Sequence, residues 1–471
     1  MISATKNNAI LAAWEKTLGE SRDAPAILSA DLQVLRTFAD IKSEAETFFE
    51  KLVAFESGSV VALQIGNSPS WPAVLLACWR AGLVVLPLGG HVESSERELA
   101  VETCKVGGIV EKNGAEIKIT ALPMSPIAWN GSQPDLLKLT SGTTAAPRAV
   151  RFRAHQLLAD CENICDTMGI TDADINFGTI PISHSYGFSN LLTPLLCRGI
   201  PLVASEDRMP RAILNSLASS GATVFPGMPV FFQKLAEMEK APALPRLRLC
   251  ISAGAPLLKS VAENFHLKFG LKIHTFLGAS ECGGICYDAS DETCHEDGFV
   301  GMPMKNVRVT LRDESAHSLI DVRSEAVGDG YFPQDEPEAL SDRRFTPGDL
   351  VEKTARGLRI AGRVTDVINI AGRKLNPMEI EARLLRFPSV RQVVVFGVPS
   401  LLRHEEAVAC VAGDVSAAAL MQFAHAELGA WQVPKDIWIV DEIPANERGK
   451  ISRRELARRY LDAHPGSLSA R

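Results

Sequence analysis

The stretch from Val60 to Leu88, VVALQIGNSPSWPAVLLACWRAGLVVLPL, indicates the fold class of this chain. Residues 60–65 predict a buried strand, residues 71–80 have helical character, and residues 83–86 predict a second short apolar strand. A strand, a helix and a strand with short connections predict a parallel βαβ unit with a right-handed crossover. Polar residues, an arginine and prolines interrupt the apolar stretch, so we do not expect it to span a membrane.

The same alternation returns later in the chain. Residues 222–225, 247–251 and 272–276 are apolar and predict strands, and residues 230–238 predict a helix between the first two. The repetition predicts an α/β fold in which the large N-terminal part consists of layered α/β sheets.

The pattern changes after about Asp349. Residues 350–360 predict a hairpin that turns near Gly357, and a compact α+β pattern follows Gly362. We therefore place the domain boundary there, with a large domain of residues 1–362 and a small domain of residues 363–471. Helices are expected at 380–386 and 419–428, and strands at 390–398 and 437–440.

Composition limits the classes of partner. The chain has 471 residues, 46% of them hydrophobic, and a net charge of 49 − 56 = −7. This balance favours neither a nucleic acid nor an acidic membrane as a partner. The N-terminus lacks the pattern of a signal peptide, and ten cysteines follow no regular framework. We expect reduced thiols in a cytoplasmic protein.

One group of thiols admits two interpretations. Cys282, Cys286, Cys294 and His295 could hold zinc, but their spacing lacks paired C-x-x-C units. Small residues near a loop are the favoured interpretation.

The strongest local signal lies between Leu137 and Val150, where T-S-G-T-T follows an apolar start. We call residues 140–148 the phosphate loop. Backbone N–H groups and hydroxyls in such a loop can surround phosphate oxygens, and Arg148 adds a cation. The loop is not a Walker loop, because G-x-x-x-x-G-K-[ST] occurs nowhere in the chain. A polar surface loop is the alternative.

Further short segments carry polar groups that could act on a nucleotide. Glu281, which ends a Leu-Gly-Ala-Ser-Glu stretch, could bind Mg²⁺. Asp349 in a Thr-Pro-Gly-Asp-Leu turn could accept ribose hydroxyls, and Gly449 could project the ammonium group of Lys450. Taken singly, each is more often an ordinary turn or surface residue.

Together these segments resemble the adenylate-forming (ANL) superfamily of acyl-CoA synthetases, nonribosomal-peptide adenylation domains and luciferases. The resemblance covers about residues 60–456. Six motifs occur in the family's order: T-S-G-T-T, P-x-x-H-x-x-G at 181–187, the Ser280-Glu281 pair, G-D-L, the segment 362–381, and a final G-K-I.

The resemblance implies a fold, a reaction and a set of site residues. It implies a small C-terminal domain that is mobile, ATP and Mg²⁺ as cofactors, and an acid–thiol ligase that forms acyl-AMP. CoA, or an acyl or peptidyl carrier protein, would accept the acyl group. ATP would be bound by Thr140, Ser141, Gly142, Thr143, Thr144, Ala253, Gly254, Ala255, Leu277, Gly278, Ser280, Asp349 and Arg363. Catalysis would use Lys450, Glu281, His184 and Arg148, with Glu281 on the metal, Gly372 and Lys374 at the thiol tunnel and Thr365 at the hinge.

The chain departs from the family at several of these positions. Ala145 and Ala149 stand where glycines are usual, and Arg148 stands where lysine is common. Leu277 replaces an aromatic residue that stacks on adenine, and Thr365 replaces an Asp or Lys at the hinge. None of these changes removes a charged group that the chemistry needs.

The acid itself cannot be identified from sequence, but two of its properties can be predicted. Relatives that activate amino acids place an aspartate just after P-x-x-H-x-x-G, whereas here Phe188 is followed by Ser189. A buried ammonium without a counter-charge is costly, so we expect an apolar acid without an α-amino group. Phe225, Met228 and Phe231 are candidates for an apolar wall or for ordinary core.

Two rival functions stay open. The acceptor could be the phosphopantetheine arm of a carrier protein, because its thiol chemistry equals that of CoA. Less favoured is a non-catalytic protein that binds a nucleotide or acyl ligand on the same fold, for which the altered phosphate loop is the only support.

Overall fold

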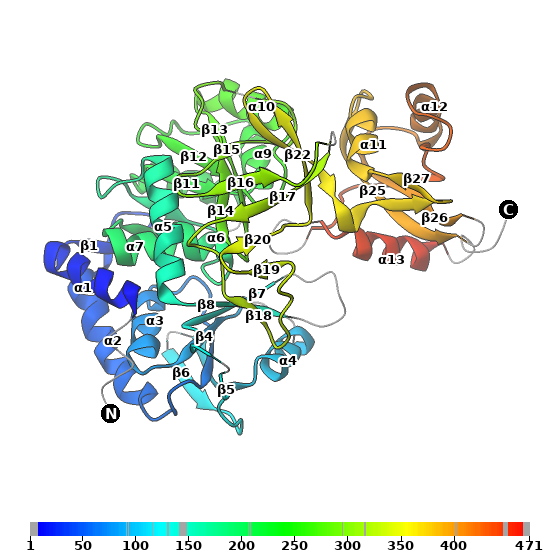
Figure 1. Cartoon of the computed structure of the whole chain (residues 1–471). Coiled ribbons are helices and arrows are strands. Elements are labelled where there is room, and N and C mark those ends of the chain that lie inside the picture. Colours follow the sequence, from blue (N-terminus) through cyan, green and yellow to red (C-terminus); the bar gives the residue numbers. More distant parts are fainter. Residues whose placement is uncertain are drawn as a thin grey trace. The chain divides into compact units, whose positions relative to one another are not determined.

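The computed structural model describes residues 8–464 apart from 91, 93, 115, 130, 141–147, 206, 208, 294, 315–316, 401–402 and 446–450. Within it the chain forms two compact units (Figure 1). The large unit comprises residues up to Thr310 together with 321–347 and 355–358, and the small unit comprises 311–320, 348–354 and the chain from Arg359 onward. The predicted combination of a large α/β part and a smaller α+β part is confirmed. The boundary between residues 362 and 363 stays a prediction.

One sheet of the large unit carries the phosphate loop. Its strand order is β18-β8-β7-β4-β3-β5-β6. β3 and β4 pair in parallel around α3, as the opening stretch predicts, and β7 and β8 form an antiparallel hairpin. The strands are β3 (Val60–Gln64), β4 (Val84–Pro87), β5 (Val106–Asn113), β6 (Glu116–Ala121), β7 (Leu136–Leu139), β8 (Ala149–Phe152) and β18 (Gly330–Phe332).

A second sheet of the large unit has a parallel centre. β13, β12, β11, β9, β10 and β1 are hydrogen-bonded in that order, all in parallel, and β14, β15 and β2 extend the sheet with antiparallel pairs. The strands are β1 (Pro25–Leu28), β2 (Val34–Thr37), β9 (Asn176–Gly178), β10 (Leu202–Ala204), β11 (Val224–Gly227), β12 (Leu249–Ser252), β13 (Ile273–Ala279), β14 (Gly283–Tyr287) and β15 (Phe299–Pro303).

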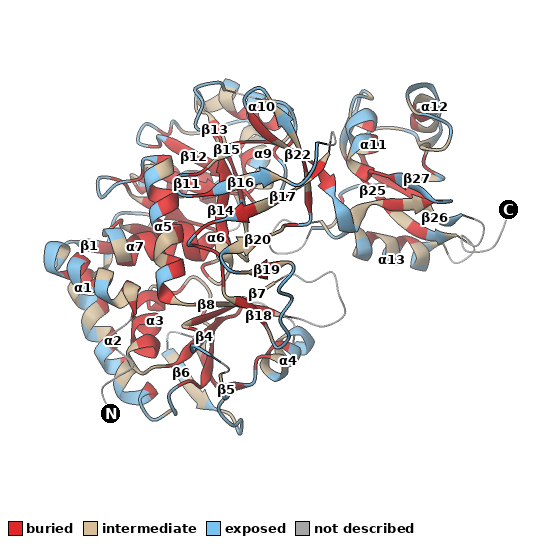
Figure 2. Cartoon of the chain, in the orientation of Figure 1, coloured by how far each residue is buried: buried red, intermediate tan, exposed pale blue. Residues whose placement is uncertain are grey.

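Helices cover both sheets of this unit, and the strands between them are largely buried (Figure 2). Runs of apolar residues in such strands are expected, because a parallel sheet has both faces covered. The helices are α1 (Ala9–Ser21), α2 (Phe38–Leu52), α3 (Trp71–Arg80), α4 (Ser94–Thr103), α5 (Ala154–Met168), α6 (Ser185–Gly187), the π-helix η2 (Phe188–Leu192), α7 (Thr193–Arg198), α8 (Pro210–Ser219), α9 (Pro229–Glu237) and α10 (Lys259–Phe269).

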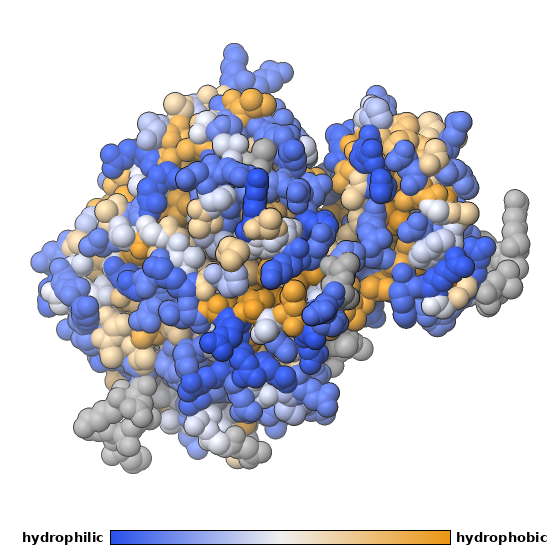
Figure 3. Space-filling view, turned by 45° about the horizontal axis from the view of Figure 1, so that its top comes forward, coloured by the Kyte–Doolittle hydropathy of each residue, from blue (hydrophilic) through white to orange (hydrophobic). Residues whose placement is uncertain are grey.

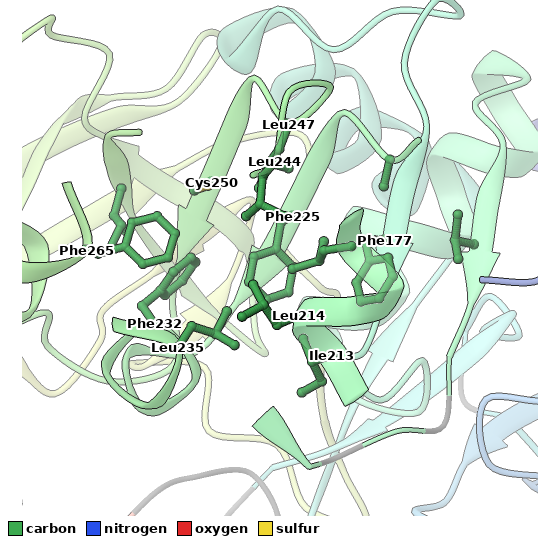
Figure 4. Close-up of a cluster of buried hydrophobic side chains, with 14 of the residues drawn as sticks. Phe177, Ile213, Leu214, Phe225, Phe232, Leu235, Leu244, Leu247, Cys250 and Phe265 are labelled. Carbon is green, nitrogen blue, oxygen red and sulfur yellow. The ribbon is translucent and has the colours of Figure 1, made fainter. Parts of the chain in front are cut away.

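An aromatic cluster forms the core between the parallel strands and helices α8 to α10 (Figure 4). The ring of Phe225 lies near its centre, with the rings of Phe177 and Phe232 at centroid distances of 5.9 and 5.2 Å. Phe225 therefore belongs to ordinary core rather than to an open pocket wall. Phe231 packs against the same cluster.

Short strands follow β15 in the chain. β17 pairs with β20 through Val322 and with β21 through Ser318, and β19 pairs with β20. The predicted hairpin exists, with its turn at residues 355–356. The strands are β16 (Arg308–Leu311), β17 (Ser318–Arg323), β19 (Leu340–Ser341), β20 (Arg344–Phe345), β21 (Asp349–Thr354) and β22 (Gly357–Arg363).

The small unit is built on a sheet of order β24-β23-β26-β25, with β27 parallel to β26. One apolar cluster joins this sheet to α11 and α12, and a second joins it to α13. The elements are η3 (Val364–Asp366), β23 (Ile368–Ile370), β24 (Arg373–Leu375), α11 (Pro377–Leu384), β25 (Val390–Ser400), β26 (His404–Gly413), α12 (Ala417–Glu427), β27 (Asp436–Val440) and α13 (Arg453–Ala463).

On the face shown in Figure 3, hydrophilic residues predominate and hydrophobic residues appear in patches between them. Within the described residues, no helix combines the length and hydropathy that crossing a bilayer requires.

Candidate active site

The β7–β8 hairpin brings the two described ends of the phosphate loop together. Leu139 pairs with Ala149, and the Thr140 N–H donates to the Arg148 carbonyl at 3.0 Å. The Thr140 hydroxyl reaches the same carbonyl at 3.3 Å. Residues 141–147, which include the predicted Ser141, Gly142, Thr143 and Thr144, lie outside the described residues. These hydrogen bonds therefore hold the two ends of the loop together.

Arg148 lies between an aromatic ring and a carboxylate. Its guanidinium carbon is 3.8 Å from the ring centroid of Tyr331, and its Nη1 lies 2.5 Å from Glu336 Oε1. In the part of the chain that the structure describes, its buried Nε has no hydrogen-bond partner. A guanidinium held by a ring, in a side chain that is 30% exposed, is suited to binding phosphate oxygens.

Glu281 is connected to Arg148 through Tyr331. The Tyr331 hydroxyl donates to Glu281 Oε1 at 3.1 Å, and the Glu281 carbonyl accepts from the Gly328 N–H at 2.9 Å. Burial, together with the Glu281 charge, raises the pKa of Tyr331, so it stays a neutral donor. One tyrosine thus contacts both residues, with the predicted phosphate cation over its ring and the predicted metal carboxylate at its hydroxyl, and this tyrosine pairs into the sheet beside β8.

A second pair of charged groups lies before the loop, and sequence reasoning missed it. Lys138 on β7 and Asp160 on α5 are 5% and 3% exposed. The Lys138 ammonium lies over the rings of Phe152 and Phe188, at 4.7 and 5.3 Å from their centroids. Burial lowers the pKa of Lys138 and raises that of Asp160, and each charge opposes the shift of the other. A lysine within an apolar strand was the signal available in the sequence.

Asp160 also connects to the segment that follows Glu281. Its Oδ1 accepts from the Gly284 N–H at 2.9 Å. A Cβ on Gly283 would come within 2.0 Å of Asp160 Oδ1, so glycine is needed there. The buried carboxylate therefore ties α5 to β14.

The P-x-x-H-x-x-G motif forms a tight turn before α6. His184 is the residue before that helix, and its carbonyl accepts from the Phe188 N–H at 2.8 Å. A Cβ on Gly187 would lie 2.1 Å from the Pro181 carbonyl oxygen, which explains the final glycine. The Tyr186 hydroxyl donates to the Ile251 carbonyl at 3.0 Å, which joins this turn to β12.

The segments expected beside the nucleotide lie at the carboxyl ends of parallel strands. Ala253 follows β12 and donates its N–H to the Gly227 carbonyl at 3.2 Å, while Gly254 and Ala255 are exposed. At the end of neighbouring β13, Leu277 is buried, Gly278 is exposed and Ser280 is half-buried. This is the edge where open α/β sheets bind ligands. Leu277 is buried and has no aromatic ring, so it provides no surface on which adenine could stack.

The remaining predicted residues belong to the small unit. Asp349 is 6% exposed, and Arg363 Nε donates to its Oδ1 at 2.7 Å, so the two predicted ribose residues are paired. Thr365 lies in η3. Gly372 has φ +86° in the turn between β23 and β24, and Lys374 on β24 is exposed. Lys450 lies outside the described residues.

The zinc alternative receives no support. Cys282 and Cys286 are buried free thiols, and His295 Nε2 lies 3.2 Å from Asp288. Cys294 lies outside the described residues. Within the described part of the chain, no three His, Cys, Asp or Glu side chains are grouped as a metal site.

Comparison with protein families gives two matches. The profile of the AMP-binding enzyme family covers residues 14–332, and that of the AMP-binding enzyme C-terminal domain covers residues 379–450.

Similar individual proteins act on different acids. A sulfoacetate–CoA ligase of Cupriavidus necator is 27% identical over 92% of this chain and 94% of its own length. A 3,4-dihydroxybenzoate–[aryl-carrier protein] ligase of Bacillus anthracis is 24% identical over 77% of this chain and 83% of its own length. The ATP-bound crystal structure of MatB from Rhodopseudomonas palustris, 23% identical, aligns over 97% of this chain and all of its own with a TM-score of 0.84. The last match shows a shared fold.

Proposed function

As the chain belongs to the AMP-binding enzyme family, we propose that it is an ATP-dependent acid–thiol ligase that forms acyl-AMP and transfers the acyl group to CoA. In the first step a carboxylate oxygen attacks the α-phosphorus of ATP, the bond to pyrophosphate breaks, and pyrophosphate leaves. In the second step a thiol sulfur attacks the acyl carbonyl, the bond to AMP breaks, and AMP leaves.

One observation carries this proposal, namely that Tyr331 connects Arg148 to Glu281. The first step forces a carboxylate against an anionic triphosphate, so positive charge near the phosphates lowers the barrier. Arg148 supplies part of that charge, and Mg²⁺, when bound at Glu281, would supply the rest. We propose that Asp349 and Arg363 bind the ribose, that Ala253 to Ala255 lie against adenine, and that His184 borders the carboxylate.

We propose that the acid is apolar and lacks an α-amino group. Ser189 follows the His184 motif, and the buried carboxylate of Asp160 already interacts electrostatically with the Lys138 charge. It is therefore a poor counter-charge for a substrate ammonium. The names of the relatives leave the acid open, because sulfoacetate and 3,4-dihydroxybenzoate differ in size and polarity.

CoA is the favoured acceptor, and a carrier protein is the alternative that one relative's name supports. We also propose a cytoplasmic location, since every cysteine among the described residues is a free thiol.

The test is ATP–pyrophosphate exchange over a panel of aliphatic, aromatic and amino acids, followed by AMP release with CoA or a carrier protein. Glu281→Gln should lower exchange by about a hundredfold without loss of the fold, whereas the exposed Glu338→Gln should not. Exchange only with free amino acids would refute the acid class. Exchange with none would favour a non-catalytic binding protein.

Separate assays of the two steps test the proposed roles of Lys450 and of the small domain. Lys450→Ala should depress adenylate formation and spare thiol transfer from supplied acyl-adenylate, because only the first step gathers negative charge at the phosphates. Gly372→Leu should do the reverse by filling the thiol path. Because Gly372 has positive φ, Gly372→Ala is the control for backbone strain. Parallel loss of both steps in both variants would contradict alternation about Thr365.

A further inference from the structure

Glu336 holds the guanidinium of Arg148, the only phosphate-loop cation in the sequence. Glu336 lies in the segment between β18 and β19, outside every motif that sequence reasoning singled out. The side chains of Arg148 and Glu336 are 30% and 55% exposed. The ion pair therefore lies at the surface, within reach of a ligand.

The backbone around Glu336 is fixed independently of this ion pair. The Glu336 carbonyl accepts from the N–H groups of Ala339 and Leu340 at 3.0 and 2.9 Å. The neighbouring Asp335 is held by Arg151 at 2.6 Å. Release of Arg148 thus needs only a rotation of the Glu336 side chain, with no rearrangement of the chain.

Arg148 keeps its place without the carboxylate as well. Its guanidinium stacks on Tyr331, and its backbone belongs to the β7–β8 hairpin. An exposed ion pair contributes only ~0–1 kcal/mol to stability. Phosphate oxygens offer a guanidinium the same paired acceptors as a carboxylate, with more charge.

We propose that Glu336 is a competing anion, which occupies Arg148 until the phosphates of ATP displace it and which returns as pyrophosphate leaves. The inference rests on the proposed function, because it assumes that Arg148 contacts phosphate. Glu336 would then be a positioning residue that weakens ATP binding and favours release of pyrophosphate.

The experiment measures binding of MgATP and of inorganic pyrophosphate by calorimetry on the full chain, without any acid. Glu336→Gln should lower both dissociation constants about two- to fivefold, the range that loss of an exposed ion pair spans. Its melting temperature should stay unchanged. Glu338 lies two residues further along the same exposed segment. Glu338→Gln is therefore the matched control and should bind as wild type does.

The gain should vanish when Arg148 is absent, so Arg148→Ala and Arg148→Ala/Glu336→Gln should bind equally. Unchanged or weaker binding by Glu336→Gln, or a gain that persists without Arg148, would overturn the inference. Because no acid is present, the two proposals fail separately: a binding gain in a chain without exchange activity would refute the ligase alone, and exchange activity without a binding gain would refute the competing anion alone.

Discussion

Two cations flank the phosphate loop, each with an acidic side chain nearby, and they lie in opposite environments. Lys138, before the loop, shares a buried site with Asp160, and both side chains are at least 95% buried. Arg148, after the loop, pairs with half-exposed Glu336. One hairpin thus carries a charge enclosed by protein and a charge open to ligand.

This difference in burial separates the structural role of Lys138 from the role proposed for Arg148. Removing one partner of a buried pair leaves an uncompensated charge in a medium of low dielectric, which is costly. The exposed pair can exchange its carboxylate for another anion at little cost. We therefore assign Lys138 to the fold and propose that Arg148 contacts the phosphates.

The largest expected effect is on stability. Lys138→Met should lower the free energy of unfolding by about 3–5 kcal/mol, because it leaves Asp160 buried and unpaired. Denaturant titration measures the loss. Lys138→Met/Asp160→Asn should recover part of it, since it removes both charges and keeps an acceptor for the Gly284 N–H.

The loss in Lys138→Met should also depend on pH. Burial raises the pKa of Asp160, and loss of the Lys138 charge removes an attraction that opposes this shift. A carboxyl whose pKa is raised in the folded state stabilises the fold at low pH, and this contribution is lost as pH rises through the folded pKa. The defect should therefore be smaller at about pH 5 than at about pH 8. A defect independent of pH would argue against a pKa of Asp160 raised into this range.

Arg148→Ala should reduce activity rather than stability, the opposite of Lys138→Met. Exchange should fall by about a hundredfold, the scale for one preorganised electrostatic partner, while the melting temperature changes little. Arg148→Lys should retain part of the activity, since it keeps the charge and loses the fork. A destabilised protein with normal exchange would reverse the assignments of the two pairs.

A smaller effect on exchange activity is expected at Tyr331, which contacts both Arg148 and Glu281. Tyr331→Phe keeps the ring under Arg148 and removes the hydrogen bond to Glu281. A hydrogen bond to a charged group is worth ~1.5–3 kcal/mol, and the lower end of this range corresponds to a fall in exchange of about tenfold. A shift of the Mg²⁺ requirement to higher concentration, with KM for the acid unchanged, would separate this role from general damage.

The smallest effect is expected at an ion pair remote from the loop. Arg198 and Asp166 lie 3.0 Å apart and are 38% and 43% exposed, similar in exposure to the Arg148 pair. Arg198→Ala should cost less than about 1 kcal/mol and leave the dissociation constant of MgATP unchanged. A change in ATP binding would show that exposure alone, rather than position beside the loop, explains the behaviour of Arg148.

Local sequence patterns predicted several of the helices and strands and the order of the motifs. Apolar periodicity located α3 at residues 71–80 and the strands around it, because side-chain burial repeats with the geometry of each element. Motif order pointed to the family and to Arg148, Glu281, Asp349 and Arg363. It could not reveal Tyr331, Glu336 or the partner of Lys138.

Those residues depend on tertiary structure, because they meet the site from elements distant in sequence. Tyr331 reaches Arg148 and Glu281 only because β18 pairs with β8, and Asp160 reaches β14 only because α5 packs there. Local patterns carry burial and turn signals, whereas the pairing of remote strands is decided by how the sheets and helices bury their apolar faces together. That packing alone decided that Lys138 is enclosed and that Arg148 is partly exposed.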